Sequence, residues 1–441
     1  MSEREDDLQN AWENLRRNAD AGREPELIAA QLGQRQISYQ ALLELIERQF
    51  IEEYAESVAF QEADTATKRL KLLLGTVDYV MAVESIHVMN DDKAAIMNAA
   101  YSNLFGYGPL DSLLLDERVT TISLEGVDKA SVRYGHGDLE SIGPLFEDEA
   151  HLVRILRRLL IDAGTDLADD LPFIETGLQV DGRPVCVSLL TPMMSFGYNA
   201  DIRVHPKQAP SLDDLVASGF MNKQAAEILV ALAKSPHGLV IVGDTEAGKT
   251  TLLSALAHQL EEQAGVVAVE RAGELRLPVG LEKRVVRWPL DDETGITFGD
   301  QIALTLEQQP TCILLDEVRS DEPQSIAPLL EEPEAPRQIW SFRGPFDSKR
   351  LRNALGMLAR RADVGQGEAL VNALYERLPF IVTVWRANGQ IRLYSIAEWQ
   401  YRQSDYPDFV LLLSTTSGEQ KLTGQQPVHP LGLPDTFWLK S

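Results

Sequence analysis

The chain has 441 residues, which fits two or three domains of common size better than one. Its hydrophobic fraction of 44% is typical of a soluble globular protein. The formal net charge of −26 disfavours general attraction to nucleic-acid phosphates or to an anionic membrane surface, so we expect no nucleic-acid partner.

The N-terminal residues 1–36 are polar and charged, and we expect a frayed helix or a disordered lead. They contain acids and no apolar core segment, which excludes a secretory signal and a transit peptide. No run approaches the roughly 18 apolar residues of a membrane span. Cys186 and Cys312 lie in apolar runs and are expected to be buried thiols, as suits a reducing cytoplasm.

Residues 37–105 repeat apolar side chains at intervals of three and four, which predicts a small helical region. This region could be a spacer that packs on the next domain or a partner-binding element. Residues 106–208 read as a compact α+β domain: short β-rich runs, an amphipathic helix in EDEAHLVRILRRLLIDAG, and two strands around the turn DGRP. The proline-bearing stretch HPKQAP at 205–210 is the expected linker.

Residues 209–414 alternate short apolar strands with helices, which predicts a mostly parallel sheet covered by helices on both faces. Ser211 and Asp214 form a capping-box-like start to the first helix. Residues 415–441 are rich in Gly, Pro and polar residues and are expected to form a loose tail. Its terminal Phe-Trp-Leu is expected to pack on its own domain, with a docking anchor as the alternative.

A phosphate-loop pattern, GxxxxGK[ST], spans residues 243–250 between the apolar strand LVIV and the helix TTLLSALAHQL. Backbone N–H groups of such a loop, with the helix dipole, hold phosphates. Lys249 is expected to reach the β and γ phosphates, and Thr250 to ligate Mg²⁺ of a bound ATP. The residues expected to bind the nucleotide are Gly243, Asp244, Thr245, Glu246, Ala247, Gly248, Lys249, Thr250 and Thr251.

Acidic residues follow two further apolar strands. Asp316 and Glu317 end the strand TCILLDE, the form of a Walker B segment in which the first acid orders Mg²⁺. Glu270 and Glu274 follow the strand VVAVE and should lie at the carboxyl edge of the sheet, where open α/β sheets bind ligands. Solvated acids at strand ends are the alternative interpretation.

Several segments together resemble the traffic ATPases of type II and type IV secretion and of type IV or tight-adherence pili, over roughly residues 70 to 415. The segments are GYGPLDSLLLDERVTTISLEG, GLQVDGRPVCVSLLTPMMSFGYNADIRVHP, the lead into the phosphate loop, VAVERAGELRLP, ILLDEVRSDEP and LPFIVTVWRANGQIRLYSIAEW. The likeness is greatest to the tight-adherence and type IV secretion branch. It implies a RecA-like ATPase domain, preceded by a small PAS-like α+β domain and the helical region.

The resemblance also implies roles. Glu274 would polarise the attacking water, and Glu317 would be the Walker B glutamate with Arg319 after it. Arg183 and Arg203 would reach a nucleotide at a neighbouring subunit's face, because this family works as hexameric rings; structural salt bridges are the competing interpretation. Inner-membrane platform proteins of a secretion or pilus system are the implied partners, with the chain in the cytoplasm beside that membrane.

The chain departs from the family pattern at several positions. Glu246 and Ala247 stand where the family usually has Gly-Ser, and Arg271 replaces an aspartate of the acidic box. In LEEPEAPRQIWSFRGP, residues 330–345, Glu334 and Phe342 fall at the two positions of the family's histidine box. Losing a charge-stabilising group can slow a reaction about a hundredfold without abolishing binding.

Three functions are compatible with these features. The first is a traffic ATPase, slow because its boxes are altered. The second is a nucleotide-binding structural or regulatory subunit that hardly turns ATP over, in a ring of its own or mixed with an active homologue. The third, a phosphotransferase acting on a small molecule, is weaker because no acceptor lid is recognisable.

Overall fold

A computed structural model describes residues 37–55, 57–168, 171–290, 294–363, 365–387, 389–401, 407–416 and 418–439. The lead predicted for residues 1–36 lies outside this part. The described residues fall into two compact units. One contains residues up to 119 with 125–130 and 141–159, and the other contains 120–124, 131–140 and 160 onward. The domain boundaries expected from sequence remain predictions.

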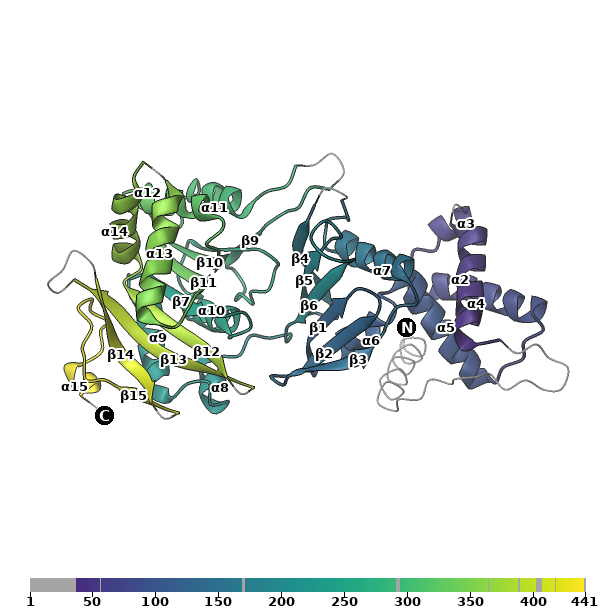
Figure 1. Ribbon diagram of the computed structural model, residues 1–441, viewed down its shortest axis with the longest axis horizontal. Coiled ribbons are helices and arrows are strands. Elements are labelled where there is room, and N and C mark those ends of the chain that lie inside the picture. Colours follow the sequence, from purple (N-terminus) through teal and green to yellow (C-terminus); the bar gives the residue numbers. More distant parts are fainter. Residues whose placement is uncertain are drawn as a thin grey trace. The chain divides into compact units, whose positions relative to one another are not determined.

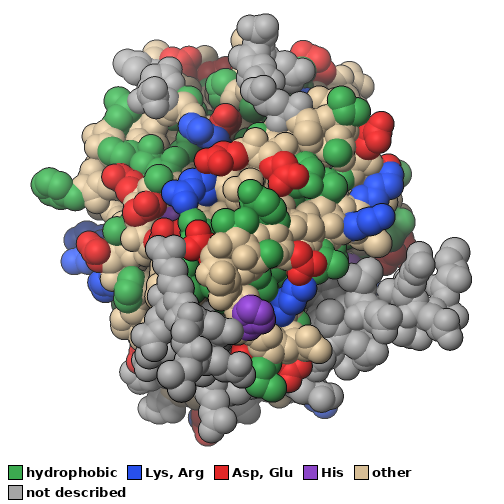
Figure 2. Space-filling model, turned by 90° about the vertical axis from the view of Figure 1, so that its right-hand side faces the viewer, with side chains coloured by type: hydrophobic (Ala, Val, Ile, Leu, Met, Phe, Trp, Pro, Cys, Tyr) green, Lys and Arg blue, Asp and Glu red, His purple; other side chains and the backbone are tan. Residues whose placement is uncertain are grey.

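The first unit is built on helices, as the periodicity of residues 37–105 predicts. Apolar side chains one turn apart, such as Leu42, Ile46 and Phe50, are buried against Leu73 and Ile96 of neighbouring helices. Its helices are α2 (Tyr39–Tyr54), α3 (Val58–Gln61), α4 (Ala66–Val83), α5 (Asn90–Phe105) and α6 (Leu110–Leu115), and α7 (Glu149–Asp162) begins in it. Figure 2 shows one face of the molecule, on which hydrophobic side chains are interspersed with acidic and basic ones.

The α+β content predicted for residues 106–208 is present. Within the described residues, a six-stranded sheet has the order β3-β2-β1-β6-β5-β4, and β5 pairs antiparallel with both β4 and β6. The strands are β1 (Val119–Glu125), β2 (Lys129–Tyr134), β3 (Leu139–Gly143), β4 (Phe173–Val180), β5 (Arg183–Leu190) and β6 (Asn199–Val204). Both cysteines are buried free thiols.

The predicted α/β sheet is confirmed in the second unit. Among the residues that the structure describes, it has the order β15-β14-β13-β12-β7-β11-β10-β8-β9, parallel from β12 to β9 and antiparallel from β12 to β15 (Figure 1). The strands are β7 (Leu239–Gly243), β8 (Val266–Glu270), β9 (Glu282–Val285), β10 (Cys312–Val318), β11 (Arg337–Arg343), β12 (Phe380–Ala387), β13 (Gln390–Gln400), β14 (Asp408–Thr416) and β15 (Glu419–Leu422).

Helices cover both faces of this sheet. In β7, Leu239 and Ile241 belong to one buried cluster, whereas Val240 and Val242 belong to another, so neither face is left to solvent. The first cluster includes side chains of α8 (Leu212–Ala217), α9 (Lys223–Lys234) and α10 (Lys249–Ala257), which η1 (His258–Leu260) extends. The second includes side chains of α11 (Phe298–Leu306), η2 (Pro323–Ile326), α12 (Ala327–Glu331), α13 (Ser348–Ala362) and α14 (Gly367–Arg377). The capping box of Ser211 and Asp214 is present at α8.

The prediction of a loose tail is wrong for described residues 418–439. Strand β15 pairs with β14, and Phe437 and Trp438 of α15 (Asp435–Trp438) are buried in the core cluster on the α9 face. Composition predicted a loop because apolar residues are sparse here, but Leu422, Leu431, Phe437 and Trp438 are almost fully buried. The expectation that the terminal Phe-Trp-Leu packs on its own domain is confirmed for Phe437 and Trp438, whereas Leu439 is exposed. In the described part of the chain, no helix is long and apolar enough to cross a membrane.

Candidate functional site

The phosphate loop connects β7 to α10 in the second unit. Gly248, at the N-terminus of α10, has φ +89°, a left-handed conformation that favours glycine. A Cβ on Gly243 would lie 2.7 Å from the carbonyl oxygen of Val384, so the backbone approaches too closely for a larger residue. Lys249 is buried, and its Nζ donates to the carbonyl oxygen of Asp244 at 2.9 Å. The loop therefore joins a buried strand to a helix, and its role toward a nucleotide stays a prediction.

The Walker B acids lie next to the loop. Thr250 Oγ1 donates to Asp316 Oδ1 at 3.2 Å, and Lys249 Nζ lies 3.7 Å from Glu317 Oε1. Ser341 of the neighbouring strand β11 also donates to Asp316. The parallel pairing of β10 with β8 and β11 brings these groups to one edge of the sheet.

This part of the site fits Mg²⁺ chemically. Burial, and next the nearby carboxylate of Glu274, raise the pKa of Asp316 to about 7. A cation would offset this excess of negative charge. Mg²⁺ prefers oxygen ligands, and a carboxylate and a hydroxyl could bind it together with the phosphates of a nucleotide. Among the described residues, no group of three or more acidic, His or Cys side chains could hold a metal ion by itself.

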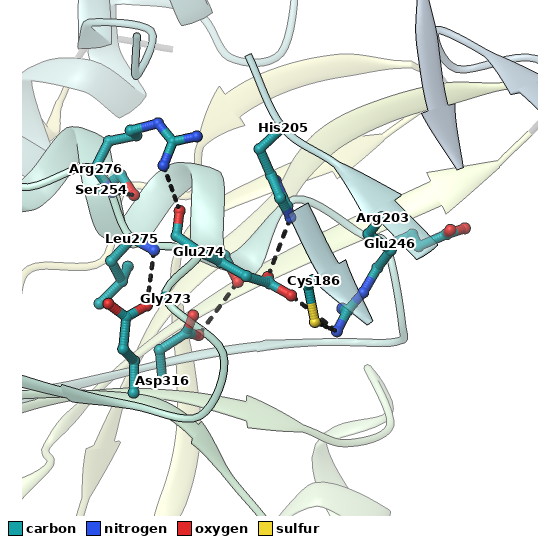
Figure 3. Close-up of polar contacts among 12 residues, drawn as sticks. Cys186, Arg203, His205, Glu246, Ser254, Gly273, Glu274, Leu275, Arg276 and Asp316 are labelled. Carbon is teal, nitrogen blue, oxygen red and sulfur yellow. Dashed lines mark hydrogen bonds and ion pairs between the residues drawn. The ribbon is translucent and has the colours of Figure 1, made fainter. Parts of the chain in front are cut away.

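Glu274 follows β8 and is buried in a charged cluster (Figure 3). Its Oε1 lies 2.8 Å from Arg203 Nη2, and its Oε2 lies 3.4 Å from His205 Nε2. Burial acts against ionisation, but Arg203 and His205 outweigh it and hold the pKa of Glu274 well below its usual range. Arg203 Nη2 also donates to Cys186 Sγ at 3.2 Å, and burial raises the thiol pKa well above its ordinary value. Glu274 is therefore an ionised but weakly basic carboxylate.

The arginines predicted to reach a nucleotide make ion pairs or backbone contacts within the chain. Glu175 on β4 lies 2.6 Å from Arg319 Nη2 and 3.4 Å from Arg203 Nη2. Arg183, at the start of β5, is buried and donates from Nε to the carbonyl oxygen of His205 at 3.2 Å. The structure thus brings Arg203 to Glu274 and Arg319 to Glu175, and their role toward a nucleotide stays a prediction.

The carboxylate of Glu246 makes an ion pair of its own. Its Oε2 contacts Arg133 of β2 and Arg386 Nη1 of β12, the latter at 2.7 Å, and its Oε1 accepts from Thr121 of β1 at 3.0 Å. In Figure 3 this carboxylate points away from Glu274. Although burial opposes ionisation, the hydrogen bond from Arg133 and the other contacts lower the pKa of Glu246. Its φ of +57° costs a residue with a side chain about 1–2 kcal/mol.

Sequence reasoning missed Arg133 and Arg386. Their contacts span 113 and 140 positions of the chain, and neither arginine belongs to a recognisable motif. The unexpected acid in the phosphate loop was the one available signal, because a partly buried carboxylate requires a partner.

The other predicted loop residues lie around this framework. Asp244 is exposed, 3.4 Å from Arg343 Nε, and its Oδ1 accepts from the backbone of Thr245 at 2.8 Å. Ala247 is buried in the core, whereas Thr251 is half-buried on α10. Of these residues, Asp244 thus makes a polar contact with a distant part of the chain.

Arg271, which replaces an acid of the family pattern, fastens the end of β10. Its Nε donates to the carbonyl oxygen of Glu317 at 2.9 Å, and its two Nη atoms bond both carboxylate oxygens of Glu322 at 3.1 and 3.0 Å. The guanidinium carbon lies 4.4 Å from the centre of the Phe298 ring. This arginine therefore positions the backbone that carries the Walker B glutamate.

Replacing Arg271 with alanine is expected to lower the free energy of unfolding by about 2 kcal/mol, because a fork-shaped pair and a backbone hydrogen bond are lost together. Arg271→Lys should recover less than half of this, since an ammonium cannot bond both oxygens in the same geometry. Urea unfolding of the two variants measures the difference. Equal stability of Arg271→Lys and the wild type would contradict the positioning role.

At the histidine-box positions, Glu334 is exposed before β11, and Phe342 is buried near the end of that strand. Phe342 pairs in register with Val242 of β7 and Val318 of β10. An aromatic ring packed between these strands cannot donate a hydrogen bond to a phosphate. At one position of the histidine box, the chain thus has a buried aromatic side chain, Phe342, instead of a polar one.

Comparisons with known proteins show which family part of the chain resembles. Residues 136–328 match the model described as type II/IV secretion system protein. A putative conjugal transfer protein of Mycobacterium tuberculosis is 30% identical over 235 residues, 52% of this chain and 66% of that protein. Competence protein ComGA of Bacillus subtilis is 30% identical over 129 residues, 29% of this chain and 34% of ComGA.

Among solved structures, the ATPase DotB of Legionella pneumophila is similar with a TM-score of 0.45 and 12% identity, covering 67% of this chain and 81% of DotB. Of the two relatives matched in sequence, the chain spans just under two thirds of the mycobacterial protein and about a third of ComGA. Residues 136–328, the segment that contains the phosphate loop and the strand ending in Asp316 and Glu317, thus match the type II/IV secretion system protein family.

Proposed function

We propose that the chain binds Mg–ATP at residues 243–250 and hydrolyses it slowly, as a traffic ATPase of a secretion or tight-adherence pilus machine. The observation that carries the proposal is the meeting of phosphate loop and Walker B acids. Lys249 Nζ lies 3.7 Å from Glu317 Oε1, and Thr250 Oγ1 lies 3.2 Å from Asp316 Oδ1. The family match and the relatives named for conjugal transfer and competence support the machine class.

Each residue has a stated task in this proposal. The loop backbone and Lys249 hold the β and γ phosphates, and Thr250 with Asp316 would hold Mg²⁺, which supplies neutralising charge when bound. Glu317 lies next to Lys249 Nζ, and its negative charge would keep that ammonium directed at the loop. Glu274, ionised and fixed by Arg203, orients the attacking water rather than taking its proton completely.

The proposed assembly is a hexameric ring, of one chain or mixed with a homologous ATPase. In it Arg183, Arg203 and Arg319 would reach the nucleotide of a neighbouring subunit after exchanging their present partners. Inner-membrane platform proteins would receive the motion, with the ring in the cytoplasm against that membrane. No nucleic acid takes part.

A second function is favoured by specific observations: a nucleotide-binding subunit with little or no turnover. Glu274 is already paired with Arg203 and His205, and Phe342 fills a position where the family has a polar group. Such a subunit would change shape on binding ATP and leave hydrolysis to a partner in the same ring.

Steady-state ATP hydrolysis and nucleotide binding of the wild type, Lys249→Ala and Glu317→Gln test the proposal. We expect the wild type to bind ATP and to release phosphate faster than Lys249→Ala, because the ammonium contacts the transferred phosphoryl group. Glu317→Gln should retain binding and lose turnover.

If the wild type binds ATP but hydrolyses it no faster than Lys249→Ala, the traffic ATPase is rejected and the nucleotide-binding subunit remains. Wild-type protein that binds no nucleotide would reject both. Phosphate appearing on a small acceptor instead of in solution would show a phosphotransferase.

A further inference from the structure

Two consecutive strands and a third that is distant in the sequence converge on Glu246. Thr121 lies on β1, Arg133 on β2 and Arg386 on β12, and all three bond the same carboxylate. Arg386 also donates from Nη2 to the carbonyl oxygen of Gly137 at 2.9 Å, so it is held at this place by more than the glutamate. The phosphate loop is thereby tied to two arginines that stand beside it.

The charges in this group do not balance. Two guanidinium groups face one carboxylate, and the side chains of Arg133, Arg386 and Glu246 are only 13%, 20% and 24% exposed. In addition, Arg133 Nε is buried and has no hydrogen-bond partner among the described residues. Positive charge and at least one donor are left over, which is the usual condition of a site that takes a second anion.

The anion that fits is a phosphoryl group. Guanidinium groups bond phosphate oxygens with the same fork geometry that they use for carboxylates. Glu246 lies three residues before Lys249, the side chain that reaches the terminal phosphates in loops of this kind. The arginine pair bonded to Glu246 therefore adjoins the same loop that carries Lys249.

We propose that Glu246 is an internal anion that occupies Arg133 and Arg386, and that the terminal phosphate of ATP competes with it for this pair. The inference rests on the proposed nucleotide binding at residues 243–250. ADP lacks the competing phosphoryl group, so Glu246 weakens ATP binding while leaving ADP binding nearly unchanged. The acid thus lowers the preference of the loop for ATP over ADP.

Glu246→Gln tests the competition, because the amide keeps the size of the side chain and removes its charge. We expect the dissociation constant for ATP to fall about tenfold and that for ADP to change less than threefold, as one charge-assisted hydrogen bond passes from the carboxylate to the phosphate. Both constants are measured by titration calorimetry on the full chain.

Two further variants separate competition from other effects. Glu246→Gln/Arg386→Gln should lose the gain for ATP, because the released donor is no longer there. Asp244→Asn removes a negative charge from the same loop without touching the arginine pair, and any gain it gives should be equal for ATP and ADP. Thermal unfolding of each variant confirms that the fold is retained.

Equal gains for ATP and ADP in Glu246→Gln, or weaker ATP binding in that variant, would overturn the inference and leave Glu246 as a brace of the loop. If neither the wild type nor Glu246→Gln binds any nucleotide, the proposed function itself fails. ATP binding by Glu246→Gln alone, with none in the wild type, supports the competition and places the nucleotide site in this loop.

Discussion

Glu274→Gln is expected to lower steady-state ATP hydrolysis by at least about a hundredfold, with the ATP dissociation constant changed less than threefold, since loss of a group that directs the attacking water removes about 10²–10⁴ in rate. The glutamine keeps the shape of the buried site but not the charge that polarises water. Phosphate release and calorimetric ATP binding of the same preparation measure the two quantities.

Glu175→Gln is the matched control for this variant. Glu175 also lies near Arg203 and is similarly buried, and its change to glutamine removes the charge that pairs with Arg319 at 2.6 Å, so this variant also loses one ion pair of the same cluster. Glu175 lies within β4 rather than after β8 and is not a candidate for orienting water, so the rate of the variant should fall less than about tenfold, which allows for slight misplacement of Arg203. Equal losses of rate and stability in both variants would reduce Glu274 to a structural ion-pair partner.

The second large effect concerns the pH dependence of stability. Burial raises the pKa of Asp316 from its ordinary value of 3.8 to about 7 in the folded chain. Because the folded state holds this proton more tightly, the stability it contributes is fully present below about pH 4 and is lost as the pH rises through 7. Between pH 5 and pH 8 the wild type should lose about 3 kcal/mol that Asp316→Asn does not lose.

Urea unfolding at pH 5 and pH 8, with chelator and without nucleotide, measures this difference. The asparagine retains an oxygen for the hydrogen bonds from Thr250 and Ser341, so the variant should fold. Glu274, whose pKa lies well below this pH range, stays ionised in both proteins, so the comparison reports the proton on Asp316. Parallel pH profiles of wild type and Asp316→Asn would show that the carboxyl is already ionised at pH 5.

Contiguous motifs made much of the α/β unit predictable. The run LVIV, the glycines of the loop and the acids after β10 are local signals, because strand, turn and helix are set by neighbouring residues. The covering of both sheet faces followed from apolar runs with no polar alternation, and β7 shows this with alternate residues in two different cores.

The ion-pair partners could not be predicted in this way. Glu175 and Arg319 are 144 positions apart, and their meeting depends on how two sheets are folded rather than on any spacing. The prediction for the C-terminal segment was wrong for a related reason. Its residues Leu422, Phe437 and Trp438 are buried by distant strands and helices, which the local composition does not reveal.

Cys186 offers a way to time the opening of the Glu274 cluster. Its thiol is fully buried beside Arg203, with a raised pKa, so a thiol reagent should react only when β5 and the acidic segment separate. With Cys312 replaced by serine, the labelling rate would report that single event. A nucleotide that keeps the cluster closed would slow the labelling of Cys186, and one that draws Arg203 away would accelerate it. The labelling rate would thus report how often the Glu274 cluster opens.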